Sequence, residues 1–428
     1  MTGNNNFKCP EWGKRTNMYE VNLRQYSLSG SFSAFESHLP RLKDLGVEIL
    51  WFMPITPIGV EGRKMNENEL GSYYAVKNYY QVSREFGTME EWKSLVSKMH
   101  DLGFKVIIDW VANHTAPDHP WTTFHPEYYI RDEKGNILPP NSDWTDTRQL
   151  DYSNHEMWSA MIDAMSFWVK ETDIDGFRCD MAKLVTTDFW FEAINRLRNI
   201  KDIIMIAEAE DPGYYQAGFD AQYTWNTFHA LSDLYRGHKS LQDILYIMSN
   251  NENLGQGLRL TFTSNHDENS WNGTEFDLFG NALQCFSVLN YTINQAIPLI
   301  YSGQEASNKK KLSFFTKDVI NWENTDLQPF YTSLNRLRSI HAAFNIDAHF
   351  ELVNTGNTAI YAYTREQEFD KVLILLNMSS NHQSFQFYDD RIKGKVLNYF
   401  TNESLELNTN QFLNLEGWGY FIFIYTTI

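Results

Sequence analysis

The chain has 428 residues, of which 43% are hydrophobic and 15% aromatic, enough apolar surface to fill one large domain plus a smaller one. Its 36 basic and 54 acidic side chains give a net charge of -18, which disfavours nucleic acid and anionic membranes and favours a neutral small-molecule partner. Three scattered cysteines, Cys9, Cys179 and Cys285, argue against a disulfide framework and a cysteine-bound zinc.

The start of the sequence and its apolar runs bear on location. The first residues lack the apolar core of a secretion signal, and no apolar run approaches the roughly 18 residues that span a bilayer. We therefore expect a cytoplasmic protein, or a periplasmic or secreted one if a leader has been removed. A monomer or a small homo-oligomer is the expected assembly.

Short β-rich runs alternate with amphipathic helical stretches over the first 340 residues. Between the third and fourth runs, Trp158, Met161, Ile162, Met165 and Trp168 recur at the spacing of one apolar helix face. Eight alternating βα units predict a closed (β/α)8 barrel, the TIM-barrel fold. The eight predicted strands are 18–27, 47–53, 105–111, 174–180, 202–208, 219–225, 258–267 and 296–303.

Two segments depart from this alternation. Residues 112–154 form a connection of some forty residues after the third strand, far longer than the roughly 2–6 residues of an ordinary βα loop. From residue 345 the pattern changes to alternating strands separated by polar turns. We therefore predict a barrel from 1–111 and 155–344, an inserted domain at 112–154, and a C-terminal antiparallel β-sandwich domain at 345–428.

Polar and charged residues stand at or just after the ends of the predicted strands. In a (β/α)8 barrel these ends meet at one rim, where catalytic groups lie. Each residue alone is readily explained as a cap, a turn residue or a solvated charge, but their convergence on one rim favours a catalytic site. They are Asp109, Asn113 and His114 after the third strand, Arg178 and Asp180 on the fourth, Glu208 on the fifth, and His266 and Asp267 on the seventh.

The run IDGFRCD places an arginine and an aspartate on one strand face. Successive side chains of a strand point to opposite sides, so Arg178 and Asp180 project together. A nearby guanidinium favours the ionised form of a carboxylate, as a nucleophile requires. Carboxylates on several strands, with an arginine, two histidines and no metal motif, fit glycosidic bond cleavage by one nucleophilic carboxylate and one carboxylic acid.

The sequence also resembles the alpha-amylase family of glycoside hydrolases (family 13). Four motifs of the family appear in order: DWVANHT at 109–115, GFRCDMA at 176–182, MIAEAE at 205–210 and SNHDEN at 264–269. The resemblance implies that Asp180 is the nucleophile, Glu208 the general acid/base and Asp267 the third carboxylate. It further implies sugar-binding roles for Tyr74, Asp109, His114, Arg178, Lys183 and His266, and it equates 112–154 with the family's second domain.

Spacing leaves one choice open, and departures from the family pattern affect two other positions. Glu210 shares a predicted strand face with Glu208, so spacing alone does not choose the acid between them; the family pattern favours Glu208. Asn113 matches a calcium ligand of many members, but Gln149 stands where a second, acidic ligand is usual, so we expect no required cofactor and no tightly bound calcium. Lys183 matches a leaving-group-side position, but Leu184 replaces the histidine that often follows it.

The sequence and the family resemblance therefore predict a retaining hydrolase of α-glucosidic bonds, with α-1,4 bonds favoured, in malto-oligosaccharides or starch-like glucans. Two alternatives stay open: a transglycosylase with the same first half-reaction, and a noncatalytic barrel that binds carbohydrate. Four tryptophans in the loops, Trp121, Trp144, Trp225 and Trp271, are candidates for stacking on sugars, although for each of them alone simple packing is the favoured role.

Overall fold

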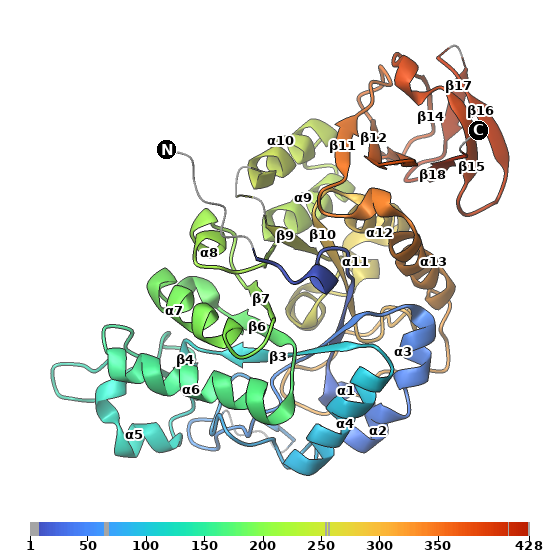
Figure 1. Ribbon diagram of the computed structural model, residues 1–428. Helices are drawn as coiled ribbons and strands as arrows, with labels where there is room; N and C mark the ends of the chain where they lie inside the picture. The colour runs from blue at the N-terminus through green and yellow to red at the C-terminus, as the bar shows by residue number, and fades with distance from the viewer. Residues whose placement is uncertain (1–7, 64–67, 253–254, 256, 410, 427–428) are drawn as a thin grey trace.

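A closed barrel of eight parallel strands forms the body of the computed structural model (Figure 1), which describes residues 8–63, 68–252, 255, 257–409 and 411–426. The strand order around the barrel is β1-β10-β9-β8-β7-β6-β3-β2, so the predicted (β/α)8 fold is confirmed. The barrel strands are β1 (Met18–Val21), β2 (Ile49–Phe52), β3 (Lys105–Val111), β6 (Gly176–Asp180), β7 (Ile204–Ala207), β8 (Ala221–Tyr223), β9 (Leu258–Thr261) and β10 (Ala296–Tyr301).

Two strands end six residues earlier than the sequence pattern predicted, β1 at Val21 and β9 at Thr261. The side chain of Asn22 accepts a hydrogen bond from the backbone N–H of Gln25, which caps a short helix, α1 (Leu23–Tyr26), so β1 stops at Val21. β9 stops at Thr261, and His266 and Asp267 lie beyond it in the loop that enters a π-helical turn, Glu268–Asn272. Polar side chains that bond to their own backbone compete with strand pairing, and the apolar alternation does not reveal this.

Helices surround the barrel and bury one face each. In α6 (His155–Thr172), Asn154 caps the first turn, and the predicted apolar face, from Trp158 to Val169, is buried. The other helices of this part are α2 (Phe32–Glu36), α3 (Leu39–Leu45), α4 (Met89–Asp101), α7 (Thr187–Arg198), α8 (Pro212–Gln216), α9 (Trp225–Tyr235), α10 (Leu241–Glu252), α11 (Glu275–Phe279), α12 (Leu283–Thr292) and α13 (Gln328–Ile340).

The segment 112–154, which we call the inserted region, follows β3 and returns to α6. It contains β4 (His114–Thr115), α5 (Pro120–Phe124), a 3-10 turn (Pro126–Tyr128) and β5 (Arg148–Gln149). β4 and β5 pair antiparallel, with His114 opposite Gln149. This pairing holds the region at the C-terminal end of β3, at the lower left of the barrel in Figure 1.

The C-terminal strands form two antiparallel sheets beside the barrel (Figure 1). Side chains of the larger sheet alternate between two cores: Tyr363 and Ile374 join the core of the barrel, whereas Leu373 and Leu375 face Phe385 of the smaller sheet. The larger sheet has the order β11-β12-β13-β18-β15-β16, and its strands are β11 (His349–Leu352), β12 (Ile360–Gln367), β13 (Asp370–Asn377), β18 (Tyr420–Tyr425), β15 (Gly394–Asn398) and β16 (Ser404–Leu407); the smaller sheet pairs β14 (Gln383–Gln386) with β17 (Phe412–Leu415).

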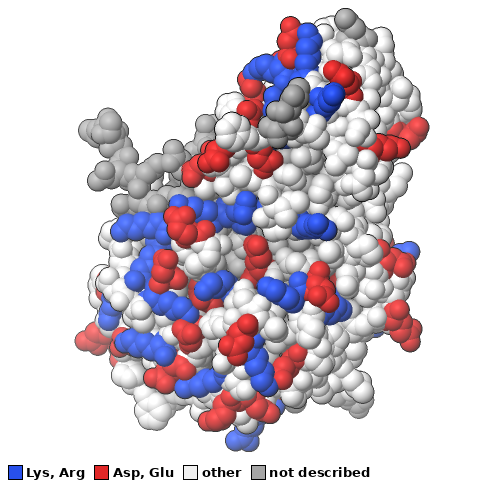
Figure 2. Space-filling model, turned by 45° about the vertical axis from the view of Figure 1, so that its right-hand side comes forward, with Lys and Arg blue, Asp and Glu red and all other residues white. Residues whose placement is uncertain are grey.

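The surface shown in Figure 2 mixes both signs of charge. Basic and acidic side chains lie next to one another across the barrel there, rather than gathering into one large basic patch. Among the described residues, no helix is both long and apolar enough to cross a bilayer. The first seven residues, which contribute to the expectation about a secretion signal, lie outside the described part.

Candidate active site

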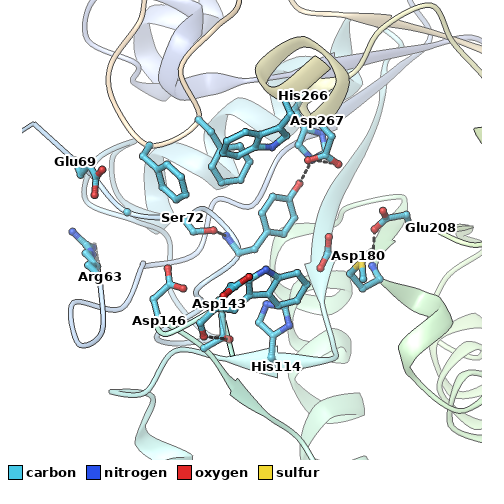
Figure 3. Close-up of a pocket in the computed structure, with 18 residues that line it drawn as sticks. Arg63, Glu69, Ser72, His114, Asp143, Asp146, Asp180, Glu208, His266 and Asp267 are labelled. Carbon is cyan, nitrogen blue, oxygen red and sulfur yellow. Dashed lines mark hydrogen bonds and ion pairs between the residues drawn. The ribbon is translucent and has the colours of Figure 1, made fainter. Parts of the chain in front are cut away.

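Three carboxylates meet at the C-terminal end of the barrel around one cavity of about 300 Å³. Asp180 is the last residue of β6, Glu208 directly follows β7, and Asp267 precedes the π-helical turn after β9. In Figure 3, Asp180 and Glu208 lie at one end of the cavity and Arg63 and Glu69 at the other, with His266 and His114 on opposite walls. The structure therefore brings together the three carboxylates that the sequence pointed to.

Arg178 links the carboxylates from inside the barrel. Its fully buried guanidinium donates from Nη1 to Asp180 Oδ1 at 2.9 Å and to Asp109 Oδ1 at 3.0 Å. Its Nη2 forms an ion pair of 3.0 Å with Glu208 Oε2, and its Nε donates to the Tyr223 hydroxyl at 2.9 Å. Arg178 and Asp180 lie on one strand face, as the alternation predicted.

Burial changes the proton affinity of these carboxylates. Burial and the adjacent charge of Glu208 raise the pKa of Asp180 well above its ordinary value, although Arg178 opposes the shift. Burial likewise raises the pKa of Asp109 to about 6, against the effect of Arg178. For Asp180 and Asp109, burial therefore outweighs the stabilisation of negative charge that one guanidinium provides.

A wall of rings lies beside Asp267. The Tyr74 hydroxyl is 2.7 Å from His266 Nε2 and donates to Asp109 Oδ2 at 3.2 Å, while the Tyr74 and His266 rings stack with centroids 5.5 Å apart. His266 Nε2 is also 3.3 Å from Asp267 Oδ2. On the opposite wall His114 is buried, and burial lowers its pKa to about 4, so it is a neutral imidazole at neutral pH.

Aromatic side chains extend the cavity away from Glu208. Trp144 of the inserted region and Trp271 of the π-helical turn both line it, together with Phe314 and Phe315 from the loop after β10. The Phe314 ring stacks on Tyr74 with centroids 6.2 Å apart. Aromatic faces of this kind suit the apolar faces of sugar rings.

The other two candidate tryptophans are not among the residues that line this cavity in the described structure. Trp121 packs edge-on against Tyr128. Trp225 stacks on the Tyr223 ring, with centroids 5.2 Å apart. Each is therefore engaged in packing, which was the alternative reading of its sequence position.

In the described structure, three predicted substrate-binding residues, Asp109, Arg178 and Lys183, are not among those that line the cavity. Asp109 is buried behind it, where it accepts hydrogen bonds from Arg178 and Tyr74. Lys183 lies exposed on the 3-10 turn Ala182–Leu184 after β6. Asp109 therefore contacts Tyr74 and Arg178, whose hydrogen bonds it accepts, and can orient both side chains.

The structure distinguishes Glu208 from Glu210. Glu208 lines the cavity, and its Oε2 accepts a hydrogen bond of 2.7 Å from the backbone N–H of Met181. Because β7 ends at Ala207, Glu210 lies outside the strand, and its carboxylate accepts from the backbone N–H of Asn226 at the start of α9. Burial raises the pKa of Glu210 to about 7, but its side chain is directed toward α9.

The surroundings of Asn113 offer a poor set of calcium ligands. The side chain of Asn113 is buried with Nδ2 3.2 Å from His114 Nδ1, and its backbone carbonyl accepts from Leu150. Calcium prefers several oxygen ligands with carboxylates among them. No group of three or more His, Cys, Asp or Glu side chains is placed to hold a metal in the described part of the chain, so we derive no step through calcium.

Sequence reasoning missed Glu20 and Phe314. Glu20 is fully buried inside the barrel on β1 and lies 2.5 Å from His266 Nδ1. A carboxylate in the apolar run MYEV was the available signal for it. Phe314 reaches the cavity from a long loop, and nothing in its local sequence indicates that contact.

Comparisons with known proteins agree with this geometry. A family model described as "Alpha amylase, catalytic domain" matches residues 10–393. The chain is similar to "Alpha-amylase 3" of Dictyoglomus thermophilum, with 24% identity over 93% of this chain and 91% of that protein. It is also similar to "Alpha-amylase MalA" of Haloarcula japonica, with 24% identity over 87% of this chain but only 57% of that protein.

A solved structure matches along almost the whole chain. The noncanonic maltogenic alpha-amylase AmyB from Thermotoga neapolitana superposes with a TM-score of 0.88 and 28% identity, covering 97% of this chain and 99% of that one. Fold, site and family match lead to the same conclusion: this chain belongs to the alpha-amylase family of glycoside hydrolases.

Proposed function

We propose that this chain is a retaining glycoside hydrolase that cleaves α-1,4-glucosidic bonds in malto-oligosaccharides or starch-like glucans. The observation that carries the proposal is the convergence of Asp180, Glu208 and Asp267 on one aromatic-lined cavity, with Arg178 contacting the first two. The relatives named as alpha-amylases and as a maltogenic alpha-amylase support an α-glucan as substrate.

In the first step, Glu208 donates a proton to the glycosidic oxygen as the bond from that oxygen to the anomeric carbon breaks. An oxygen of Asp180 forms a new bond to the same carbon, which gives a covalent glycosyl-enzyme and releases the shortened glucan. In the second step, Glu208 takes a proton from water, the water oxygen bonds to the anomeric carbon, and Asp180 leaves as a carboxylate. The two displacements restore the original configuration.

The contacts suit these two roles. Glu208 Oε2 accepts from Met181 N–H, which leaves Oε1 as the oxygen that can carry the catalytic proton. Asp180 Oδ1 accepts from Arg178, which stabilises the negative charge on Asp180 when Glu208 holds the proton. Alongside burial, the charge of Glu208 is among the causes that raise the pKa of Asp180, so two adjacent negative charges are disfavoured, which suits a mechanism in which one of the two carboxyl groups holds a proton.

Variants of the two carboxylates test these roles. Glu208→Gln is expected to lower kcat by roughly 10²–10⁴-fold on maltotriose or soluble starch, because an amide donates no proton to the leaving oxygen. Asp180→Asn should lose at least as much, because an amide is not a competent nucleophile. The matched control is Glu210→Gln, which should retain most activity. Near-normal turnover by either of the first two variants, with intact fold by circular dichroism, would contradict the roles.

The transglycosylase alternative shares the first half-reaction and differs only in the acceptor, a sugar hydroxyl in place of water. Products longer than the starting maltotriose would identify it. The noncatalytic alternative is not retained, because the chain belongs to an enzyme family and has all three carboxylates.

The remaining parts of the proposal concern conditions and partners. We propose that the enzyme requires no calcium, because the donor set at Asn113 lacks carboxylates. Buried thiols at Cys9, Cys179 and Cys285, none in a disulfide, suit a reducing cytoplasm. A net charge of -18 favours a neutral glucan over nucleic acid or anionic lipid as partner. A monomer or small homo-oligomer is proposed as the assembly.

A further inference from the structure

Glu20 is a carboxylate inside the barrel that, among the described residues, neither lines the cavity nor pairs with a lysine or arginine. It lies on β1 between Trp51 of β2 and Tyr301 of β10 in register, and its side chain has no solvent exposure. Its Oε1 is 2.5 Å from His266 Nδ1, whereas Oε2 is buried without a hydrogen-bond partner among the described residues. Burying a carboxylate in this way is costly unless an adjacent charge offsets it, and His266 is the group in position to do so.

His266 is the second member of a chain of hydrogen bonds that crosses the site. Its Nε2 is 2.7 Å from the Tyr74 hydroxyl, and that hydroxyl donates to Asp109 Oδ2 at 3.2 Å. Asp109 also accepts from Arg178. The Tyr74 hydroxyl has one proton; when it gives that proton to Asp109, His266 Nε2 donates to Tyr74, while Nδ1 donates to Glu20. Both ring nitrogens then carry protons, and the ring is an imidazolium.

The charged groups around His266 agree with that protonation state. Glu20 on β1 and Asp267, the next residue in the same loop, place negative charge beside His266. Arg178 on β6 disfavours the positive charge of His266. The ring of Trp51 on β2 contacts the His266 ring edge-on. Burial lowers the pKa of His266, but Asp267 and Glu20 outweigh burial and raise that pKa to about 9.

We propose that Glu20 is a positioning residue that keeps His266 protonated, so that Nε2–H stays a donor toward Tyr74, Asp267 and the sugar-binding side of the cavity. A neutral His266 with Nδ1–H on Glu20 would present a lone pair at Nε2. Tyr74 would then donate to His266 and release Asp109, so the direction of the hydrogen bond between Tyr74 and His266 would reverse. The activity readout of this inference rests on the proposed function.

Glu20→Gln is the decisive variant, because a glutamine oxygen still accepts from Nδ1–H but no longer stabilises the positive charge. We expect the alkaline limb of the pH profile of kcat/KM to move at least one pH unit toward acid, with the acid limb unchanged. At pH 8 the loss should be at least about twofold larger than at pH 6, since a one-unit shift from about 9 leaves about half of His266 protonated at pH 8. The matched control is Glu305→Gln. Glu305 is another fully buried carboxylate but pairs with Arg41 and Tyr19 instead, so its pH profile should keep the wild-type shape.

A second measurement needs no activity. With 13C-labelled histidine, the His266 resonance, identified by its absence in His266→Gln, should remain that of an imidazolium up to pH 8 in the wild-type chain and titrate at lower pH in Glu20→Gln. If Glu20→Gln does not fold, Glu20→Asp serves: it keeps the charge, so it should keep His266 protonated at pH 8.

The outcomes separate the two hypotheses. A wild-type His266 that loses its proton below pH 7 would overturn the inference, and so would a Glu20→Gln chain in which His266 still holds its proton at pH 8. A chain without glycosidase activity that nevertheless shows the expected histidine titrations would contradict the proposed function and leave the role of Glu20 supported.

Discussion

Arg178 faces three carboxylates with one positive charge. The side chain is fully buried between the rings of Trp51 and Tyr223, at 5.3 and 5.4 Å from its guanidinium carbon, so it has little freedom to turn away. Such an arrangement is costly to build, because each buried ion loses its hydration. The arrangement serves the proposed mechanism, in which Asp180 is negatively charged and is stabilised by Arg178 while Glu208 holds a proton.

Strand alternation was sufficient to predict that Arg178 and Asp180 point the same way. It did not predict that burial and Glu208 would outweigh Arg178 and raise the pKa of Asp180, because that balance depends on residues from two other strands. The position of Asp109 shows the same limit. The family resemblance implied sugar contact for Asp109, whereas in the three-dimensional structure it accepts hydrogen bonds from Tyr74 and Arg178 and is not among the residues that line the cavity.

Asp175, at the opposite end of the barrel from the site, offers a stability test at the scale of single residues. Its buried carboxylate accepts from Val106 N–H and His100, and it pairs with Lys105 and Lys201. Asp175→Asn should lower the free energy of unfolding by about 3 kcal/mol, because it leaves cations around a partly buried neutral group. Urea unfolding at pH 7 measures this.

The control for that test is Asp173→Asn. Asp173 pairs with Lys201 too, but its side chain is 69% exposed, so its loss should cost about 0–1 kcal/mol. Burial opposes ionisation of Asp175, yet His100, Val106 and Lys201 lower its pKa to about 2. The stabilisation is therefore present above an unfolded pKa near 4 and is lost as pH falls toward 2. Equal stability of the two variants at pH 7 would contradict this account.

At the scale of elements, periodicity predicted the strands and helices better than the connections. The apolar face of α6 and all eight barrel strands could be predicted from local patterns, because the residues that face the core recur at a regular spacing along each helix and strand. The loops that carry Trp144 and Phe314 meet at one cavity through contacts between distant segments. The ends of β1 and β9 depend on local capping and on loop packing, which no hydrophobic pattern encodes.

The inserted region carries the prediction about metal. Prolonged treatment with EDTA should change neither the melting temperature nor the activity appreciably, because Asn113 is the one family calcium ligand matched here and Gln149 adds no negative charge. Differential scanning fluorimetry with and without the chelator measures the melting temperature. A large loss of stability that calcium restores, and magnesium does not, would show that backbone and side-chain oxygens supply the missing ligands.

At the scale of the whole molecule, the C-terminal sheet is part of the barrel's support. Arg365 on β12 donates to the carbonyl oxygens of Thr292 and Ile293 after α12, and Tyr363 packs into the barrel core from the same strand. The change from helical to alternating pattern near residue 345 was enough to predict a separate set of strands. That pattern could not show that one face of the sheet packs against the barrel. A strand with apolar residues on both faces has the same sequence pattern whichever neighbour each face contacts.

The central claim is that Asp180 attacks the anomeric carbon and Glu208 manages the proton, and product stereochemistry tests it most directly. Proton NMR of maltopentaose cleavage, read before mutarotation, reports the anomer of the newly formed reducing end. Two successive displacements predict that the α-anomer appears first and the β-anomer follows only by mutarotation. A β-anomer formed first would mean direct attack by water, and it would contradict Asp180 as the nucleophile even though every motif of the family is present.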